Sequence, residues 1–491
     1  MEFWLILVLL SLIMYWLLQR SMGKMTQTPI WLYWLALMMP TFMWLAWAYF
    51  AGEDRPLPIL IVIIPVVLGI FFYRRLVHIG KPTEEDDRKT EAKTPPTPEP
   101  SLNLSQVRPI DSQEEKALRN CFPWNVYYLQ NIDYRPQAIL CRGKLKAVPD
   151  EAYSKIKQNI EKVFGDRFFL IFQESFRGQP FFALVPNPQA QTSGEEQGLE
   201  ESINRTSLAL SLLLVTLITT TVIGLEMSNL TLNQALDNPS LIWPAISYSV
   251  ALISILGIHE LGHYFAAARY KISTSLPYFI PFPFFLGTIG AFVQRKSPVP
   301  HRRALFDIAI VGPWAGLLIT IPVLLWGFSL SEVVPLQEEN VLHFDSLDLR
   351  FSFLVAILGK LALGSQLQPE MGLDLHPLAV AGYIGILFTA LNLMPIGSLD
   401  GGHIVHAVFG QRMALAIGQI TRIVSILFAM AYNYFWIWAI LLWLMPLIDR
   451  PALNDVTELD NWRDFSGLMT LAVLVIILLP LPTPIAQLLN I

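Results

Sequence analysis

The sequence predicts an all-α polytopic membrane protein with about ten transmembrane helices and one small soluble α+β insertion. Hydrophobic residues make up 53% of the 491 residues and charged residues only 15%, whereas an average soluble domain carries about 25% charged residues. Apolar runs of about 20 residues recur along the chain, and each is long enough to cross a bilayer as a helix. One long polar segment between the third and fourth runs shows helix and strand patterns, which predicts the soluble insertion.

Three apolar runs open the chain and define an amino-terminal membrane part, residues 1–79. The first run, 3–18, follows the acidic Glu2 and lacks a small-residue cleavage pattern, so we expect a retained helix and not a removed signal peptide. The other runs lie at 31–50, 57–77, 206–225, 241–266, 304–330, 376–394, 413–430, 432–448 and 467–489. If 413–430 and 432–448 form one long kinked helix, the number of spans falls to about nine.

Basic residues fall on alternate loops between these runs, and acidic residues fall on the others. Because lysine and arginine are enriched in cytoplasmic loops, the basic loops are predicted to face the cytoplasm and the amino terminus to lie outside. The basic loops carry Arg20, Lys24, Arg74, Arg75, Arg269, Lys271, Arg302, Arg303, Arg412 and Arg450. The pattern predicts a multi-pass membrane protein. It does not distinguish a plasma membrane from a thylakoid membrane, since both impose the same hydropathy.

The polar segment divides into a linker and a folded part. Residues 80–110 are rich in Pro, Glu, Thr and Lys and are predicted to be a disordered linker. Residues 111–200 are predicted to form a small cytoplasmic α+β domain, with a helix at 150–164 and strands at 137–145, 168–175 and 181–185. Its role stays open between regulation or substrate sorting and a plain spacer. The two cysteines of the chain, Cys121 and Cys141, lie here and are expected to be reduced.

The apolar run 241–266 contains the motif His259-Glu260-Leu261-Gly262-His263. The i to i+4 spacing places both imidazoles on one face of a helix, and Glu260 projects beside them. Two neutral imidazoles suit zinc. Ionisable residues at membrane depth are costly and are usually retained for function. The motif therefore predicts a Zn²⁺ site inside the membrane, with Glu260 as the catalytic base for a zinc-activated water.

A catalytic zinc needs a third protein ligand, and Asp400 is the best candidate. It follows Pro395, which breaks the apolar run 376–394. The runs 241–266 and 376–394 cross the membrane in the same direction, so the aspartate and the paired histidines should lie at similar depth near the cytoplasmic side. One carboxylate and two neutral imidazoles leave zinc with a net positive charge, which lowers the pKa of bound water.

Three further side chains near Asp400 are candidates for the site. Asn392 precedes the proline by three residues and is predicted to donate to a developing oxyanion or to hold the substrate backbone. His403 and His406 are the alternative third ligands. His403 is otherwise expected to orient the site or to have a structural role.

His-Glu-x-x-His in one membrane run, followed by Asn-x-x-Pro-x-x-x-Leu-Asp-Gly in a later run, resembles the site-2 protease family of intramembrane zinc metalloproteases. The amino-terminal spans and the soluble segment are similar to those of the chloroplast and cyanobacterial members. The resemblance implies a three-helix core formed by 241–266, 304–330 and 376–394. It also implies that the two histidines and Asp400 bind zinc and that Glu260 is the catalytic base.

Two other segments resemble parts of that family. Gly312-Pro313-Trp314-Ala315-Gly316 is similar to a glycine motif of the middle core helix, although small residues four apart also suit general helix packing. The proline-rich run 277–283, with the strand-like 288–294, resembles a loop that dips into the membrane beside the site. Its edge could bind an unwound substrate strand by β-addition, and an interfacial aromatic loop is the alternative.

These features predict an intramembrane zinc metalloprotease that cleaves membrane-anchored proteins in or near their transmembrane segments. Residues 201–410 are predicted to form the catalytic core and 411–491 the carboxyl-terminal helices. The expected partners are membrane-anchored substrates and the lipid bilayer, and the net charge of −5 gives no indication of a nucleic-acid partner. The alternatives are a metal-binding membrane transporter and a catalytically silent scaffold. The sequence does not predict the oligomeric state.

Overall fold

The structure is a computed structural model, and it describes residues 29–51, 110–135, 138–175, 178–187, 195–228, 237–282, 286–335, 347–369, 371–431 and 435–491, with a few isolated positions between them. The chain divides into two compact units, Met1–Asn103 and Leu104–Ile491, and each is described by itself. The predicted spans at 3–18 and 57–77 and the linker 80–110 lie largely outside the described residues.

The amino-terminal unit contains helix α2 (Ile30–Ala51), which coincides with the predicted span at 31–50. Its sequence carries no charged residue, as expected for a helix in lipid. Two polar side-chain atoms on α2 are satisfied by backbone carbonyls of neighbouring predicted spans. The Tyr33 hydroxyl donates to Leu76 at 3.1 Å, and the Trp34 indole donates to Ser11 at 3.0 Å.

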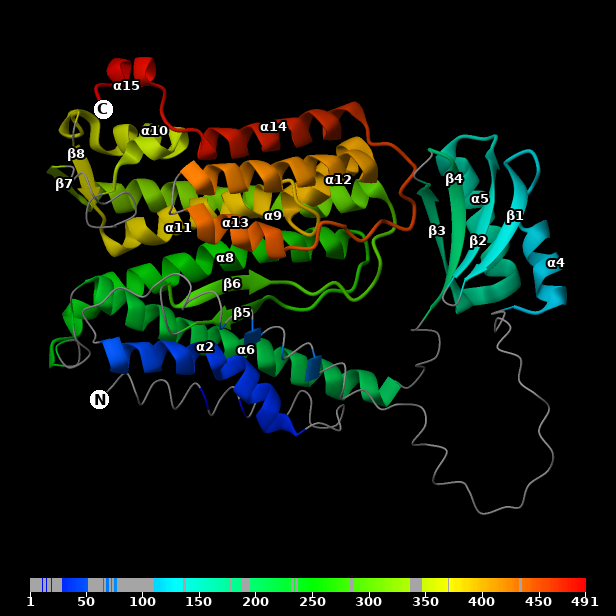
Figure 1. Cartoon of the computed structure of the whole chain (residues 1–491), viewed down its shortest axis with the longest axis horizontal. Coiled ribbons are helices and arrows are strands. Elements are labelled where there is room, and N and C mark those ends of the chain that lie inside the picture. Colours follow the sequence, from blue (N-terminus) through cyan, green and yellow to red (C-terminus); the bar gives the residue numbers. More distant parts are fainter. Residues whose placement is uncertain are drawn as a thin grey trace. The chain divides into compact units, whose positions relative to one another are not determined.

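The soluble insertion is a four-stranded antiparallel sheet with two helices (Figure 1). Its strands follow the order β1-β2-β4-β3, which makes β1 and β3 the edges. The elements are α4 (Ser112–Asn120), β1 (Tyr127–Arg135), β2 (Ala138–Leu145), α5 (Pro149–Phe164), β3 (Phe168–Glu174) and β4 (Pro180–Pro186).

The insertion has a hydrophobic core, to which Val456, from the segment before α14, also contributes. Ile156 and Ile160, one turn apart on α5, are both buried in it. Phe172 and Phe182 lie opposite each other on β3 and β4 and stack with ring centroids 4.1 Å apart. The predicted strands and helix are therefore present, and their alternating or helical spacing explains which face of each is buried.

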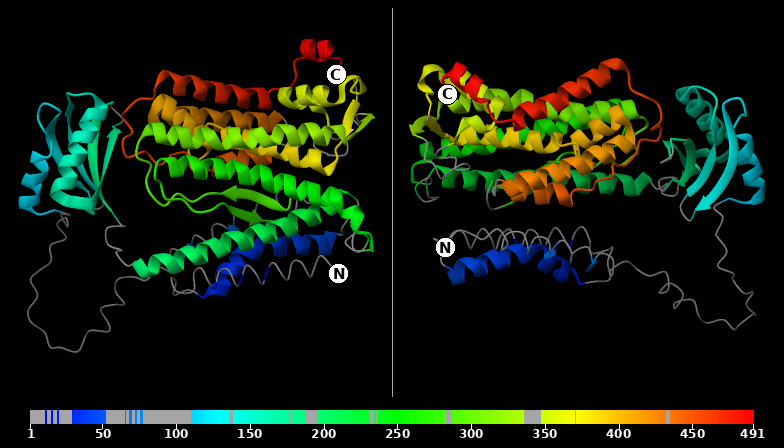
Figure 2. Two further views of the ribbon diagram at one scale, coloured as in Figure 1. Left: turned by 180° about the vertical axis from the view of Figure 1, so that it is seen from behind. Right: turned by 45° about the horizontal axis from the view of Figure 1, so that its top comes forward.

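The rest of the second unit, Leu104–Ile491, is a layered group of helices (Figures 1 and 2). The helices α8 (Trp243–Arg269), α9 (Arg302–Ser329) and α11 (Pro377–Leu393) pack against one another in its centre. The surrounding helices are α6 (Glu195–Met227), α10 (Phe353–Leu363), α12 (Asp400–Ala431), α13 (Trp436–Leu444), α14 (Asn461–Leu478) and α15 (Thr483–Leu489).

The predicted number of about ten spans is not confirmed. Among the described residues, five helices are long and apolar enough to cross a bilayer, and they cover 206–227, 240–269, 302–329, 400–430 and 461–478. The predicted span at 376–394 is the 17-residue α11, which stops before Pro395 because proline cannot continue the helical hydrogen bonds. The predicted span at 432–448 contains only the nine-residue α13 in its described part.

Two short pairs of antiparallel strands lie between the helices. The strands β5 (Tyr278–Pro281) and β6 (Thr288–Phe292) form a hairpin, where the sequence predicts a non-helical loop and a strand. The strands β7 (Glu332–Pro335) and β8 (Met371–Asp374) form the second pair, with α10 between them in the chain. The hairpin packs with β5 against α6 and with β6 against α8, so it lies beside the central helices.

Candidate metal centre

Helix α8 presents the two histidines of the predicted motif toward the centre of the molecule. His259 and Glu260 are buried, with 6% and 9% of their surface exposed. Because the histidines are one turn apart, their rings lie side by side, and the two Nε2 atoms are 3.2 Å from each other. Glu260 offers a carboxylate oxygen within 4.8 Å of the ligand atoms of both histidines.

Asp400 reaches the same point from a different part of the chain. The chain leaves α11 at Met394, turns through Pro395, and starts α12 at Asp400. One carboxylate oxygen, Oδ2, lies 3.3 Å from His259 Nε2 and 3.2 Å from His263 Nε2. The structure thus brings together the three side chains that the sequence selects as ligands.

The spacing of these three atoms fits zinc. A tetrahedral zinc ion with ligand atoms about 2.0–2.1 Å away holds those atoms about 3.3–3.4 Å apart. The triangle formed by the two Nε2 atoms and Oδ2 has sides of 3.2, 3.2 and 3.3 Å. Two imidazoles and one carboxylate are also a donor set that zinc prefers in catalytic sites. The residues present therefore match the size and the chemistry of a zinc ion.

Helix α9 fixes the orientation of His263. The Nδ1 atom of His263 lies 2.8 Å from the backbone carbonyl of Ile308, which can only accept a hydrogen bond. Nδ1 therefore carries the proton, and the Nε2 lone pair is available for a metal. Such hydrogen bonds to backbone carbonyls are a common way of orienting histidine ligands.

The glycines of α9 make room for both imidazoles. A Cβ atom on Gly312 would lie 2.2 Å from His263 Nε2, and one on Gly316 would lie 3.2 Å from His259 Nδ1. The contact at Gly312 excludes any larger residue unless the ring moves. The glycine segment thus has a specific task at this site beside the general packing of small residues.

Two further groups border the centre. The Asn392 amide nitrogen lies 3.4 Å from His259 Nε2, so the predicted oxyanion donor is at the site. The backbone of Val293, the first residue after β6, lies near the Glu260 carboxylate. The contact with Val293 could not be predicted, because it depends on how the hairpin folds against α8.

His403 and His406, the alternative third ligands, have other partners. The two ring nitrogens of His403 face Asp449 and Arg295, at 2.7 and 3.1 Å. Those of His406 face Asp449 and Asp455, at 3.0 and 3.1 Å. The structure therefore does not support either histidine as the third ligand. The sequence prediction missed both aspartates and Arg295, because they are far from the histidines in the chain and form no recognisable spacing.

The region around this centre matches a known family. Residues 247–432 match the family model of Peptidase family M50. This segment includes both predicted motifs, and the match confirms the resemblance to the site-2 proteases that the motifs indicate.

Curated relatives agree with this family. The chain is 27% identical to probable zinc metalloprotease EGY1, chloroplastic, of Arabidopsis thaliana, over 70% of this chain and 66% of the relative. It is 27% identical to probable zinc metalloprotease EGY2, chloroplastic, of Oryza sativa subsp. japonica, over 74% of this chain and 65% of the relative. The alignments thus span just under two thirds of these relatives. No solved structure matches the chain. The description of the matching family and the names of these relatives agree with the predictions of a metallopeptidase and of zinc.

Proposed function

We propose that this protein is an intramembrane zinc metalloprotease that hydrolyses peptide bonds in or near the transmembrane segments of membrane-anchored proteins. The observation that carries the proposal is the triangle of two imidazole nitrogens and one carboxylate oxygen, with Glu260 beside it. Its members come from α8 and α12, both of which are apolar enough to cross a membrane. Charged and metal-binding groups at such a depth are best explained by function.

Each side chain has a role in this proposal. His259, His263 and Asp400 would hold the zinc ion. Zinc supplies a Lewis acid that polarises the scissile carbonyl and lowers the pKa of water. Glu260 is not needed as a ligand, so its carboxylate is free to take a proton from the attacking water and to pass it to the leaving amine. The backbone of Val293 lies near that carboxylate.

Asn392 is proposed to stabilise the negative charge that develops on the carbonyl oxygen. Its amide nitrogen is 3.4 Å from the ring of His259, so it borders the space where a substrate carbonyl must lie. A donor that is already oriented toward such a charge stabilises the transition state more than the ground state.

The hairpin β5–β6 is proposed to bind the substrate as an added strand. A peptide bond inside a helix is hydrogen-bonded and closed to attack, so the substrate segment must unwind, and its backbone then needs new partners. Strand β6 pairs with β5 and leads into Val293, which contacts Glu260. Ile289 and Phe292 on β6 are exposed. A strand added there would present its peptide bonds next to the proposed base.

We also propose that the catalytic centre lies toward the cytoplasmic or stromal side of a plasma or thylakoid membrane. Arg269 ends α8 and Arg302 begins α9, and basic residues at helix ends favour that side. The proposed boundary between the core, 201–410, and the last part, 411–491, falls at Gly410. This residue has non-helical angles, φ 80° and ψ 163°, inside α12.

The proposal is tested by Glu260→Gln in the purified full-length protein, with Glu332→Gln on β7 as the control. The variant should lose cleavage of a membrane-anchored substrate and keep one zinc per chain, because the ligands remain while the base is lost. The control should match the wild type in both measurements. Cleavage that survives in Glu260→Gln would refute the assignment of a hydrolytic base and would favour a metal-binding transporter.

A further inference from the structure

A second group of buried polar side chains lies further along α12 from the proposed metal centre, and the proposed reaction does not use it. It consists of His403 and His406 on α12 and Asp449 and Asp455 on the segment between α13 and α14. All four are less than 9% exposed. His403 and His406 follow Asp400 by about one and two helical turns, so they belong to the same stretch of helix as the proposed third ligand.

The hydrogen bonds of this group define a chain of contacts. Arg295 donates to His403 Nε2 at 3.1 Å, so the proton of His403 is on Nδ1. That atom lies 2.7 Å from Asp449 but without the alignment of a hydrogen bond. The other histidine, His406, lies between two carboxylates, Asp449 at 3.0 Å and Asp455 at 3.1 Å. Both of its ring nitrogens therefore donate. His406 is therefore hydrogen-bonded at both ring nitrogens, which suits a structural role, whereas His403 is hydrogen-bonded at Nε2 and only lies close to Asp449 at Nδ1.

The stretch of α12 that carries Asp400 depends on such contacts because it is interrupted at both ends. The turn through Pro395 precedes Asp400, and the non-helical Gly410 separates 400–409 from the rest of α12. Arg302 adds a further anchor, since it donates to the carbonyl of Ala407 at 3.1 and 2.6 Å. The position of the proposed third ligand is therefore set by bonds to other parts of the chain and not by one continuous helix.

We call residues 449–455 the clasp segment. Its backbone at 453–455 is attached to the soluble insertion. Phe172 donates to the carbonyl of Leu453 at 2.7 Å, and Asp455 donates to the carbonyl of Phe172 at 2.9 Å. Phe172 lies on β3, an edge of the sheet, so the clasp segment extends that sheet. On its other side, Asn454 donates to Pro300 at 3.0 Å and accepts from Arg302 at 3.2 Å.

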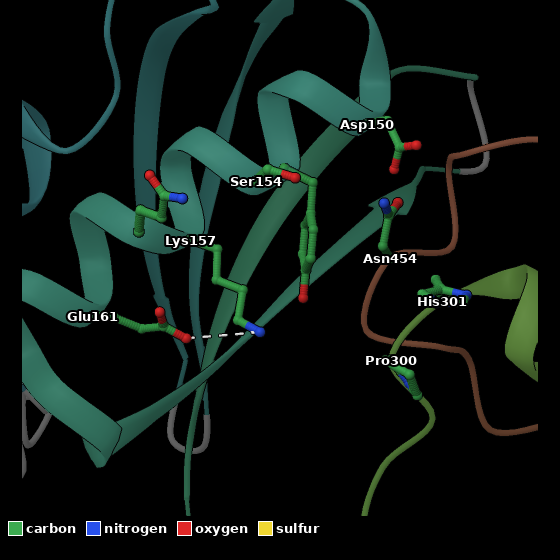
Figure 3. A pocket seen from close by; sticks show the side chains of 9 residues that line it. Asp150, Ser154, Lys157, Glu161, Pro300, His301 and Asn454 are labelled. Atoms are coloured by element: carbon green, nitrogen blue, oxygen red, sulfur yellow. Dashed lines mark ion pairs between the residues drawn. The ribbon is translucent and has the colours of Figure 1, made fainter. Parts of the chain in front are cut away.

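Beside this strand the insertion and the helices are separated by a pocket of about 380 Å³. Figure 3 shows Asp150 and Lys157 of α5 on one side of it and Pro300 and His301 on the other. Exposed side chains also meet beside this space, Asp150 with Arg303 at 3.8 Å and with Thr457 at 3.4 Å. The clasp segment instead joins β3 to the catalytic helices through backbone hydrogen bonds. A disturbance of the insertion can thus reach Asp455, and through it the stretch 400–409.

We infer that the clasp segment couples the soluble insertion to the proposed metal centre, and that His406 is a positioning residue for Asp400. This inference rests on the proposed function and gives the insertion a task in it. When the insertion is attached through β3, Asp449 and Asp455 hold His403 and His406, and Asp400 is fixed against the two imidazoles. When the attachment is broken, the third ligand is less well positioned and zinc binds more weakly.

The test uses the full-length protein in detergent and measures zinc affinity by competition with a chelator, independently of cleavage. His406→Ala should lower the affinity by about 10–100-fold, the usual effect of removing a group that orients a ligand. Asp455→Asn keeps the backbone bonds to Phe172 and should lower it less, and this variant decides the question if His406→Ala does not fold. The control is Arg412→Ala. Arg412 also bonds the insertion, through the carbonyl of Ser175, but it lies beyond Gly410, so its loss should leave the affinity unchanged.

A second readout separates positioning from plain destabilisation. The absorption spectrum of the Co²⁺-substituted protein reports the geometry of the ligands. It should change in His406→Ala and Asp455→Asn and stay the same in Arg412→Ala. Wild-type zinc affinity and an unchanged Co²⁺ spectrum in both His406→Ala and Asp455→Asn would overturn the inference alone. A wild-type protein that binds no zinc would overturn the proposed function and the inference together.

Discussion

A methyl group added at Gly312 should remove zinc from this protein. In Gly312→Ala, the new Cβ would lie 2.2 Å from Nε2, 2.3 Å from Cε1 and 2.7 Å from Cδ2 of the His263 ring. Carbon and nitrogen atoms in van der Waals contact are about 3.5 Å apart or more. The ring must therefore move by about 1 Å or more, since the backbone of α9 is held among packed helices.

That movement cannot be absorbed without loss of binding geometry. Nδ1 of His263 is bonded to Ile308 at 2.8 Å, and Nε2 forms the triangle with His259 and Asp400. A shift of the ring breaks the bond to Ile308 or opens the triangle. Overpacking of this kind costs about 1–3 kcal/mol of folding stability. The loss of zinc affinity should be larger, about 100-fold or more, because a direct ligand is displaced and not only its supporting partner.

The matched control is Gly316→Ala, one turn further along α9. Its Cβ would lie 3.2 Å from Nδ1 of His259, a contact that a shift of a few tenths of an ångström relieves. The assay is zinc content and affinity of both purified variants by chelator competition, with thermal unfolding to confirm that they are folded. We expect strong loss in Gly312→Ala and near wild-type binding in Gly316→Ala. Equal zinc affinity in the two variants would show that the close contact with Gly312 does not limit the site.

Further predictions concern the third ligand, the oxyanion, the substrate and the insertion. Asp400→Ala should deplete zinc in elemental analysis, and undiminished stoichiometry would mean that another group is the third ligand. Asn392→Ala should keep zinc but lower kcat by about 100–1000-fold, and an unchanged kcat would exclude its role. Replacing Gly, Pro or Asn by Leu in a substrate span should slow cleavage because the helix unwinds less readily, and an equal rate would contradict this. Burial raises the pKa of Cys141 to about 12, so at pH 8 its thiolate is scarce and maleimide labelling should be slow until the protein is denatured. Rapid labelling of the folded protein would show that this strand is open.

The sequence alone was sufficient for features that depend on local spacing. The i to i+4 pattern placed His259 and His263 on one face of a helix, and the proline break before Asp400 marked where a carboxylate could enter the same layer. The prolines of 277–283 excluded a helix and a short pattern indicated the strand at 288–294, but the pairing of β5 with β6 was not predicted. These predictions needed only the geometry of single elements and the direction of two helices.

Other features could not be predicted because they depend on how distant elements cross. The contact between Gly312 and His263 exists only because α8 and α9 pack closely at that turn. The clasp segment shows no strand pattern in the sequence. Its pairing with the edge strand β3 could not be predicted, because the two segments lie far apart in the chain. The sequence could not exclude His406 as a ligand, because no sequence rule reveals that Asp449 and Asp455 occupy both of its ring nitrogens.

The central claim is that two histidines of α8 and the first residue of α12 together hold zinc. It is tested most directly by zinc K-edge X-ray absorption on the purified full-length protein. The account predicts one zinc per chain with nitrogen and oxygen neighbours at about 2.0–2.2 Å, two of them imidazoles. A spectrum with sulfur neighbours at about 2.3 Å, with a single imidazole, or from a protein without bound zinc would contradict it.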